Sequence, residues 1–352
     1  MTSHERFTRM YEHRDADRVP VIDSPWGATI ERWRREGMPE NVSYVDYFGL
    51  DKVSGIYPDY SPRYEARILE ETDEYRICTT GNGATLKEWK HAASTPEFLD
   101  FKIKDRESWA EASKRMEPSR DRVNWERLRN NYPEWRKRGD WIEAELNFGF
   151  DLTHSWMVGT DRVLLALIED PEWMYDMFNR QLTAGLAMLD MIWDEGYRFD
   201  VVCWSDDMGY KGKQFFSLDT YRELEKPFHK RAVEWAHAHG IKAHLQSCGC
   251  INPFVPELIE IGLDALNPLE VKAGMNPIQL KRDYGKDLVF HGGVNAVLWT
   301  EPEKIEAEMR RVIPALKENG GYIFSSDHSV PSAVSLEDFR RIVNLAKDLG
   351  KY

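Results

Sequence analysis

Four short apolar runs in the second half of the chain each end in a cluster of polar residues, and this pattern constrains the fold most strongly. The runs alternate with amphipathic segments long enough to be helices, which is typical of parallel βα units. In a barrel of such units every strand ends on the same face, where the active site lies. The sequence therefore predicts an α/β fold, a (β/α)8 barrel whose mouth carries the chemistry. The polar clusters are residues 205–209, 247–249, 291–295 and 325–328.

The same alternation predicts the individual strands and helices. β-Branched and aromatic runs bounded by turn residues indicate strands, and longer segments with apolar residues on one face indicate helices. A polar stretch rich in Arg and Glu, 105–140, should add surface helices. Helices are expected, for example, at 30–35, 220–239 and 302–318, and strands at 18–23, 141–148, 199–204, 242–246, 265–269, 288–291 and 322–325.

Residues 66–90 depart from this alternation. Two strand-like runs flank the Asn-Gly pair at Asn82, which is typical of an antiparallel hairpin. No internal repeat, low-complexity tract or flexible linker divides the chain. We therefore interpret residues 1–352 as one domain with a hairpin insertion at 66–90.

Composition and charge argue against several classes of protein. The formal net charge of −13 opposes general nucleic-acid binding, which needs a basic face to neutralise phosphates. No run approaches the roughly 18–20 apolar residues of a membrane span, and the charged N-terminus lacks an apolar signal region. Four cysteines are too few for a disulfide framework, so we expect a cytoplasmic protein. The many Trp and Tyr residues can fill a core and also line a pocket for a small-molecule substrate.

Side-chain alternation places His244, Gln246 and Cys248 on one face of a strand and its end. At about 3.3 Å per residue His244 would lie about 13 Å deeper than Cys248, so the two should not share a metal ion unless the strand curls. We interpret His244 as a buried, hydrogen-bonded histidine, with metal ligation as the weaker alternative. Cys248 is either a small core side chain or a functional thiol at the mouth.

The paired carboxylates Asp206 and Asp207 offer several chemistries. They could bind a cation, act as acid and base, or hold a basic substrate, and their repulsion should raise one pKa if both are buried. Alternatively, one of the two caps the following helix or turn while the other is solvated. His328 follows Asp327 at the last strand end, and an Asp-His pair can orient an imidazole. The candidate catalytic residues are Asp206, Asp207 and His328.

Other residues at or near the expected strand ends are candidates for substrate binding. The Gly292-Gly293 pair beside them indicates either a close backbone approach to a ligand or a tight turn. The candidates are Trp26, Asn147, Trp204, Gln246, His291 and Asn295.

In order and spacing, these segments resemble the uroporphyrinogen decarboxylase superfamily over nearly the whole chain. The resemblance implies the same (β/α)8 barrel. The segments that carry it are Asp17-Arg18-Val19-Pro20-Val21, Tyr47-Phe48-Gly49 with Asp51, Ser205-Asp206-Asp207-Met208-Gly209, Cys248-Gly249, Gly262-Leu263-Asp264-Ala265-Leu266-Asn267-Pro268, His291-Gly292-Gly293 and Gly321-Tyr322-Ile323-Phe324.

The superfamily includes two activities, and the sequence favours the second. Decarboxylases carry an arginine-rich segment after the first strand that holds the substrate's carboxylates, whereas here no arginine follows residues 24–28 until Arg32. The second branch contains cobalamin-dependent methyltransferases, which move a methyl group between a corrinoid protein and a small substrate. These enzymes hold zinc with a His two residues before a Cys and a third ligand at the last strand end. The matching positions here are Gln246, Cys248 and His328.

The resemblance thus implies zinc held by Cys248 and His328, with Asp206 or Asp207 as a third ligand, because Gln is a poor zinc ligand. It also implies a separate corrinoid protein that docks at the barrel mouth. The same residues could instead form a metal-free site in which His328 and Asp207 act as acid and base. A homodimer is one assembly that we consider.

Three functions follow from these observations. The preferred one is a corrinoid-dependent methyltransferase or demethylase that acts on a small methylated or methoxylated substrate. The first alternative is a lyase that decarboxylates uroporphyrinogen or a related polycarboxylate. The second is a non-catalytic barrel that binds a tetrapyrrole or corrinoid.

Overall fold

Seven parallel strands form the central sheet of the protein. The computed structural model describes residues 1–90 and 95–352. The strands are hydrogen-bonded in the order β1-β6-β7-β10-β11-β12-β13, and every neighbouring pair is parallel. The fold is therefore mixed α/β with a curled parallel sheet, as the strand pattern predicted in outline. The strands are β1 (Val53–Ile56), β6 (Trp141–Glu145), β7 (Val201–Ser205), β10 (Lys242–Gln246), β11 (Ala265–Asn267), β12 (Val289–His291) and β13 (Tyr322–Ile323).

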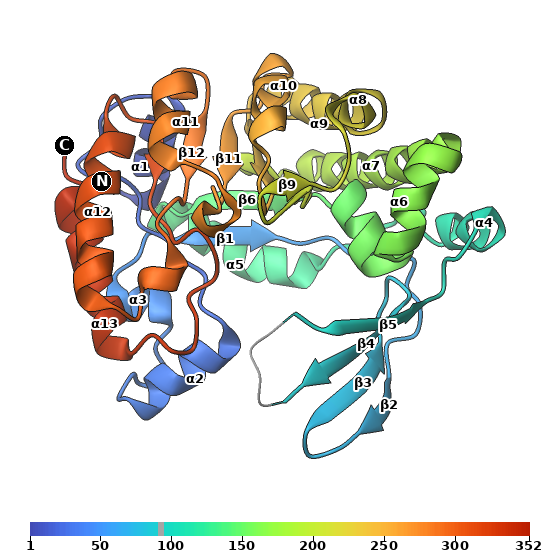
Figure 1. The fold of residues 1–352 in the computed structure, drawn as a ribbon, viewed down its shortest axis with the longest axis horizontal. Coiled ribbons are helices and arrows are strands. Elements are labelled where there is room, and N and C mark those ends of the chain that lie inside the picture. The colour runs from blue at the N-terminus through green and yellow to red at the C-terminus, as the bar shows by residue number, and fades with distance from the viewer. Residues whose placement is uncertain (91–94) are drawn as a thin grey trace.

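Helices surround this sheet (Figure 1). The last helix shows why they form: Ser335 caps it by accepting the N–H of Asp338, and its apolar residues recur every three or four positions and are buried. The predicted surface helices of 105–140 and the helix at 302–318 are confirmed. The helices are α1 (Ser3–Tyr11), α2 (Gly27–Arg35), α3 (Tyr44–Phe48), α4 (Arg106–Lys114), α5 (Trp125–Arg138), α6 (Thr160–Glu169), α7 (Pro171–Asp194), α8 (Leu218–Thr220), α9 (Lys226–Ala238), α10 (Val255–Glu260), α11 (Pro277–Tyr284), α12 (Pro302–Lys317) and α13 (Leu336–Leu349).

The predicted first strand, 18–23, is an extended segment with isolated bridges instead of a regular strand. Its residue Val21 forms a parallel bridge with Phe324, just after β13, and two backbone hydrogen bonds link that segment to Phe324. On the opposite side, Asp51 donates its backbone N–H to the carbonyl oxygen of Val21. Pro20 lacks an N–H group, which limits regular pairing here. The segment thus lies between the last strand and the residues that precede β1.

A second, antiparallel sheet projects from one side of the molecule (Figure 1). Its strands β3 (Tyr75–Thr79) and β4 (Ala84–Trp89) form the predicted hairpin across the Asn-Gly turn. The sheet has two further strands, β2 (Ile68–Glu71) and β5 (Glu97–Phe101). The first of the two strand-like runs is divided into β2 and β3 by a turn, in which the hydroxyl of Thr72 accepts the N–H groups of Glu74 and Tyr75.

Helix α1 covers the amino-terminal end of the central sheet. It begins with a capping box between Thr2 and Glu5. The rings of Phe7 and Tyr11 both stack on Trp141, the first residue of β6, at a centroid distance of 5.3 Å.

The chain also forms a two-stranded ribbon, β8 (Gly209–Tyr210) and β9 (Lys213–Gln214). In the two described ranges, no helix has the length and apolar character needed to cross a membrane.

Candidate active site

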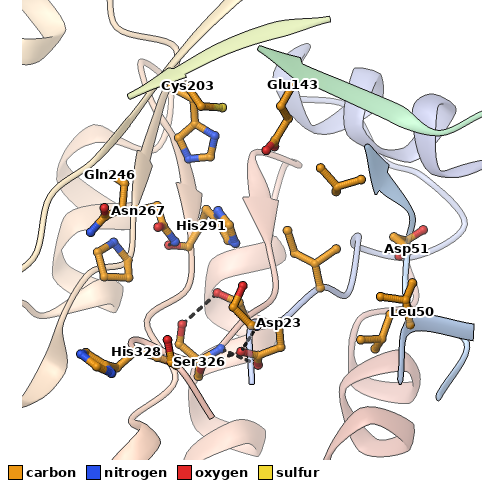
Figure 2. A pocket seen from close by; sticks show the side chains of 18 of the residues that line it. Asp23, Leu50, Asp51, Glu143, Cys203, Gln246, Asn267, His291, Ser326 and His328 are labelled. Atoms are coloured by element: carbon orange, nitrogen blue, oxygen red, sulfur yellow. Dashed lines mark hydrogen bonds between the residues drawn. The ribbon is translucent and has the colours of Figure 1, made fainter. Parts of the chain in front are cut away.

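A cavity of about 580 Å³ opens at the carboxyl ends of the central strands and extends along their inner face. Parallel strands place their carboxyl ends together, which is where the site of such a fold is expected. Figure 2 shows side chains from strand ends and from the middle of strands pointing into this space. The polar residues that line it include Asp23, Glu143, Cys203, His244, Gln246, Cys248, Asn267, His291, Ser326 and His328.

Five residues predicted from the sequence lie in this lining: His244, Gln246, Cys248, His291 and His328. His244 is 6% exposed, and its Nδ1 lies 3.1 Å from the Tyr11 hydroxyl, so the prediction of a buried, hydrogen-bonded histidine is confirmed. Trp26 is not part of the lining, but its ring lies beside His328 with centroids 6.3 Å apart.

Asp207 holds the end of β10 in place. Its Oδ1 accepts the backbone N–H of Cys248 at 2.6 Å and the side-chain amide of Gln246 at 3.1 Å. Burial raises the pKa of Asp207 above its ordinary value. Burial and the nearby Asp207 carboxyl also raise the pKa of the Cys248 thiol well above its ordinary range, so Cys248 is protonated at neutral pH. Asp207 therefore acts on the cavity through Gln246 and Cys248.

Asp206, predicted as a catalytic residue, is fully buried and lies outside the cavity lining. Its side chain is 0% exposed and accepts hydrogen bonds from His229 Nε2 and from the backbone N–H of Asp151, each at 2.8 Å. The Tyr221 hydroxyl lies 3.2 Å from the other ring nitrogen of His229. Burial raises the pKa of the neighbouring Glu225 well above its ordinary value. The alternative, in which one carboxylate caps the following helix or turn and the other is solvated, does not describe the pair, because Asp206 accepts from His229 and the Asp151 N–H and Asp207 accepts from Gln246 and the Cys248 N–H.

Besides Trp26, three other predicted substrate-binding residues do not line the cavity. Trp204 is 1% exposed and packs against Phe148 and His229, because alternation along β7 turns it away from the face that carries Cys203. The Asn147 amide donates to Glu145 at 3.0 Å. The Asn295 side chain accepts the N–H of Val297 and caps a short 3₁₀ turn.

Asp327 does not orient His328. Its two carboxylate oxygens accept the backbone N–H groups of Val271 at 2.8 Å and Ala296 at 2.7 Å. The carboxylate thus ties two loops to the last strand end, and the expected Asp-His pair is corrected.

Asp23 is a cavity residue that the sequence reasoning missed. Its carboxylate accepts the N–H of Ser326 at 3.0 Å and the Ser326 hydroxyl at 2.7 Å, as the dashed lines of Figure 2 show. Burial raises the pKa of Asp23 to about 7. The sequence did contain a pattern that could have identified it, because Asp23 follows an apolar run just as the four polar clusters in the second half of the chain do.

Glu143 and Cys203 were also missed, and with His244 they form a group in which one ligand atom from each residue lies within 4.8 Å of the others. Burial raises the pKa of Glu143 to about 7 and lowers that of His244 to about 4. The available signal was a polar residue in the middle of an otherwise apolar strand. We name these three residues the floor cluster.

The cavity lining carries carboxyl groups without a facing cation. None of its residues in the described ranges is Lys or Arg. Asp51, at one edge, is the exception among the carboxylates, because Arg6 and Arg18 pair with it from outside the lining at 2.9 and 2.6 Å. The interior is therefore neutral to acidic, which suits a neutral or cationic ligand better than an anionic one.

The residues that the resemblance implies for zinc do not fit that ion. In the part of the chain that the structure describes, Cys248 and His328 belong to no group of three His, Cys, Asp or Glu ligand atoms within 4.8 Å. The Cys248 sulfur lies 3.1 Å from the amide nitrogen of Gln246, which occupies the position where a histidine ligand would be needed. The possible third ligands are also engaged, since Asp206 is enclosed and Asp207 accepts two hydrogen bonds.

Comparison with known proteins places the chain in a family. The family model for uroporphyrinogen decarboxylase (URO-D) matches residues 152–349. Among solved structures, a methyltransferase from Methanosarcina mazei has a TM-score of 0.67 at 15% identity, over 99% of this chain and 99% of that one. A chitinase from Chromobacterium violaceum has a TM-score of only 0.38 at 10% identity, over 93% of this chain and 98% of that one. The search of curated proteins gave no match.

The family match covers more than half of the chain, from a position after β6 through the last helix, and includes most strands that line the cavity. The fold of the Methanosarcina protein extends the likeness to nearly every residue. The chain belongs to the uroporphyrinogen decarboxylase (URO-D) family.

Proposed function

We propose that this chain is a methyltransferase that removes a methyl group from a small methylated or methoxylated substrate and delivers it to a corrinoid held by a separate protein. The observation that carries the proposal is the charge of the cavity, whose described lining contains carboxyl and neutral polar groups but no Lys or Arg. Such a lining suits a neutral methoxy compound or a methylated amine. The fold likeness to the Methanosarcina methyltransferase supports the same branch of the family.

We infer that the central sheet closes into a (β/α)8 barrel through the extended segment 18–23. The hydrogen bonds from this segment to Phe324 on one side and from Asp51 on the other support closure. In this arrangement residues 1–352 form one domain, and the sheet β2–β5 is an insertion at its side. A closed barrel would leave the mouth as the access route to the cavity.

Asp23 is the acid that the reaction needs. Breaking the bond between methyl carbon and oxygen or nitrogen leaves an electron pair on the heteroatom, which must be protonated unless it is already a good leaving group. With its pKa raised to about 7 by burial, Asp23 carries a proton in a large fraction of molecules at neutral pH. Its hydrogen bonds to Ser326 fix the carboxyl group at the cavity wall.

The methyl acceptor would be supplied from outside. A corrin ring with its side chains is larger than a cavity of about 580 Å³, so the corrinoid would face the mouth while the substrate occupies the interior. Gln246 and Asn267, at the ends of β10 and β11, would then orient the substrate by hydrogen bonds between these two positions. Asp207 is a positioning residue, because it holds Gln246 and the Cys248 backbone.

Decarboxylation of a polycarboxylate fits the cavity less well. Each carboxylate of such a substrate would need a cation, and an unbalanced pair of like charges 4 Å apart costs about 4 kcal/mol at an effective dielectric of 20. Asp23 and Glu143 would add to this repulsion whenever they are ionised. The described lining offers no compensating Lys or Arg.

The test is methyl transfer to cob(I)alamin, free or bound to a corrinoid protein, from a panel of methoxylated aromatics and methylated amines. We expect methylcobalamin formation with at least one substrate, and we expect Asp23→Asn to slow it about 100-fold or more. Asp161→Asn, at an exposed position on α6, is the matched control and should retain the rate. Failure across the panel, with carbon dioxide released from uroporphyrinogen, would instead establish the decarboxylase. Ligand binding without any turnover would identify a non-catalytic barrel.

A further inference from the structure

The floor cluster is built by three adjacent strands. Cys203 on β7 is directly opposite His244 on β10, and Glu145 on β6 is directly opposite Cys203. Glu143 lies two residues before Glu145, so alternation points it to the same face of the sheet. Figure 2 shows Glu143 and Cys203 near each other at one end of the cavity, with His328 at the other end. The register of the sheet therefore places a carboxyl, a thiol and an imidazole together, remote from His328.

These side chains occupy a place that normally holds apolar residues. The inner face of a barrel-forming parallel sheet is usually filled by Val, Ile and Leu. Buried polar groups are destabilising unless they find partners. Yet Nε2 of His244 and Nδ1 of His291 are both buried and have no hydrogen-bond partner among the described residues. Their ring centroids lie 5.4 Å apart, and both residues line the cavity. A ligand bound at this place would give these atoms a partner.

Tyr11 prepares His244 for such a ligand. The Tyr11 hydroxyl lies 3.1 Å from Nδ1 of His244, which fixes the ring and leaves Nε2 free. Metal-binding histidines are oriented in this way by a hydrogen bond at the other ring nitrogen. Tyr11 itself is held by stacking on Trp141.

We propose that Glu143, Cys203 and His244 bind one zinc ion on the floor of the cavity. Sulfur and imidazole donors favour zinc over magnesium or calcium, and a carboxylate completes a set of three protein ligands. Tetrahedral zinc holds such atoms about 3.5 Å apart. The three ligand atoms already lie within 4.8 Å of one another, so small side-chain rotations bring them into place. The fourth position would face the cavity and take water or a heteroatom of the substrate.

The site differs from the zinc position that sequence resemblance implies, which lies at the strand end around Cys248. It also differs from the group Asp206, Glu225 and His229, whose members are all fully buried and in which Asp206 already accepts the His229 hydrogen bond. Metal binding at the floor cluster is measurable without substrate or corrinoid. Its outcome is therefore independent of the proposed methyl transfer.

The test is titration of the chelator-treated full chain with Co²⁺, which replaces zinc and reports thiolate ligation by a charge-transfer absorption band. We expect one equivalent to bind with this band and with the strong visible absorption of tetrahedral cobalt. Cys203→Ser should abolish the band, whereas the matched variant Cys248→Ser should retain it. Metal content of the protein as purified should show the same difference for zinc.

A second variant keeps the thiol and tests the histidine. Tyr11→Phe removes only the hydroxyl that fixes His244, so we expect the band to remain and Co²⁺ affinity to fall about 10- to 100-fold. This variant covers the case in which Cys203→Ser does not fold. The proposal is overturned if wild-type protein gives no charge-transfer band, if Cys248→Ser is the variant that loses it, or if Tyr11→Phe binds Co²⁺ as tightly as wild type.

Discussion

Replacing Asp206 with alanine should destabilise the fold and should affect catalysis only through folding. The Asp206 carboxylate is fully buried and accepts hydrogen bonds from His229 Nε2 and the Asp151 backbone, both at 2.8 Å. Alanine would leave two buried donors without an acceptor, at about 1–3 kcal/mol each. The gross loss is therefore about 2–6 kcal/mol.

Neighbouring carboxyl groups reduce this loss. Burial and the charges of Asp207 and Asp206 raise the pKa of Asp151 to about 8, and burial with the Asp206 charge raises that of Glu225. Removing Asp206 relieves this repulsion by about 1–2 kcal/mol. We expect a net decrease of about 1–4 kcal/mol in the free energy of unfolding, a sizeable part of the roughly 5–15 kcal/mol that stabilises a typical protein.

Urea unfolding followed by tryptophan fluorescence measures this change as a lower midpoint. Asp206→Asn is the matched control, because its carboxamide oxygen can still accept the Asp151 N–H, so about half of the loss should be recovered. Methyl transfer by the folded fraction of either variant should remain within a few-fold of wild type. An unchanged midpoint together with abolished turnover would show that Asp206 is catalytic and that its structural assignment is mistaken.

Three further outcomes follow from the site and its surroundings. Because burial raises the pKa of Asp23 to about 7, a rate that needs its protonated form should fall as pH rises through about 7, and Asp23→Asn should remove that limb from a rate–pH profile. Asp51→Asn removes a fully buried carboxylate from its two arginine partners. Urea unfolding should show a free energy of unfolding lower by about 3 kcal/mol. The control Asp161→Asn, at an exposed position, should change that free energy by less than about 0.5 kcal/mol. Gln246→His supplies the imidazole missing at the strand end, so bound zinc should rise by up to one equivalent; unchanged zinc content would contradict the view that Gln246 disables that position.

Most of the central sheet was predictable because buried parallel strands are short apolar runs with polar ends. The runs at β6, β7 and β10 to β13 have this form. β1 was missed because Val-Ser-Gly-Ile contains only two strongly strand-forming residues. The segment 18–23 has a strand-like composition, but its pairing depends on contacts with residues about 30 and 300 positions away, and no local pattern encodes them.

The site was predictable in location but less so in membership. Strand-end position correctly brought Gln246, Cys248 and His328 to one cavity. Which other residues line the cavity depends on the direction of their side chains. The alternation that correctly placed His244 of β10 on the inner face would, if applied to β7, have pointed Cys203 into the cavity and Trp204 away from it. The role of Asp327 could not be read from sequence, because its partners are backbone N–H groups of two distant loops.

Because Tyr11 contacts His244, the stability of the first helix should depend on ligand binding inside the cavity. Helix α1 closes the amino-terminal end of the sheet, and its Tyr11 hydroxyl is the link between that outer layer and the interior imidazole. By thermodynamic linkage, any ligand that prefers the oriented imidazole also lowers the population of molecules in which α1 has detached. Amide hydrogen exchange in α1 should therefore slow when the floor of the cavity is occupied, although no residue of the helix backbone touches the ligand.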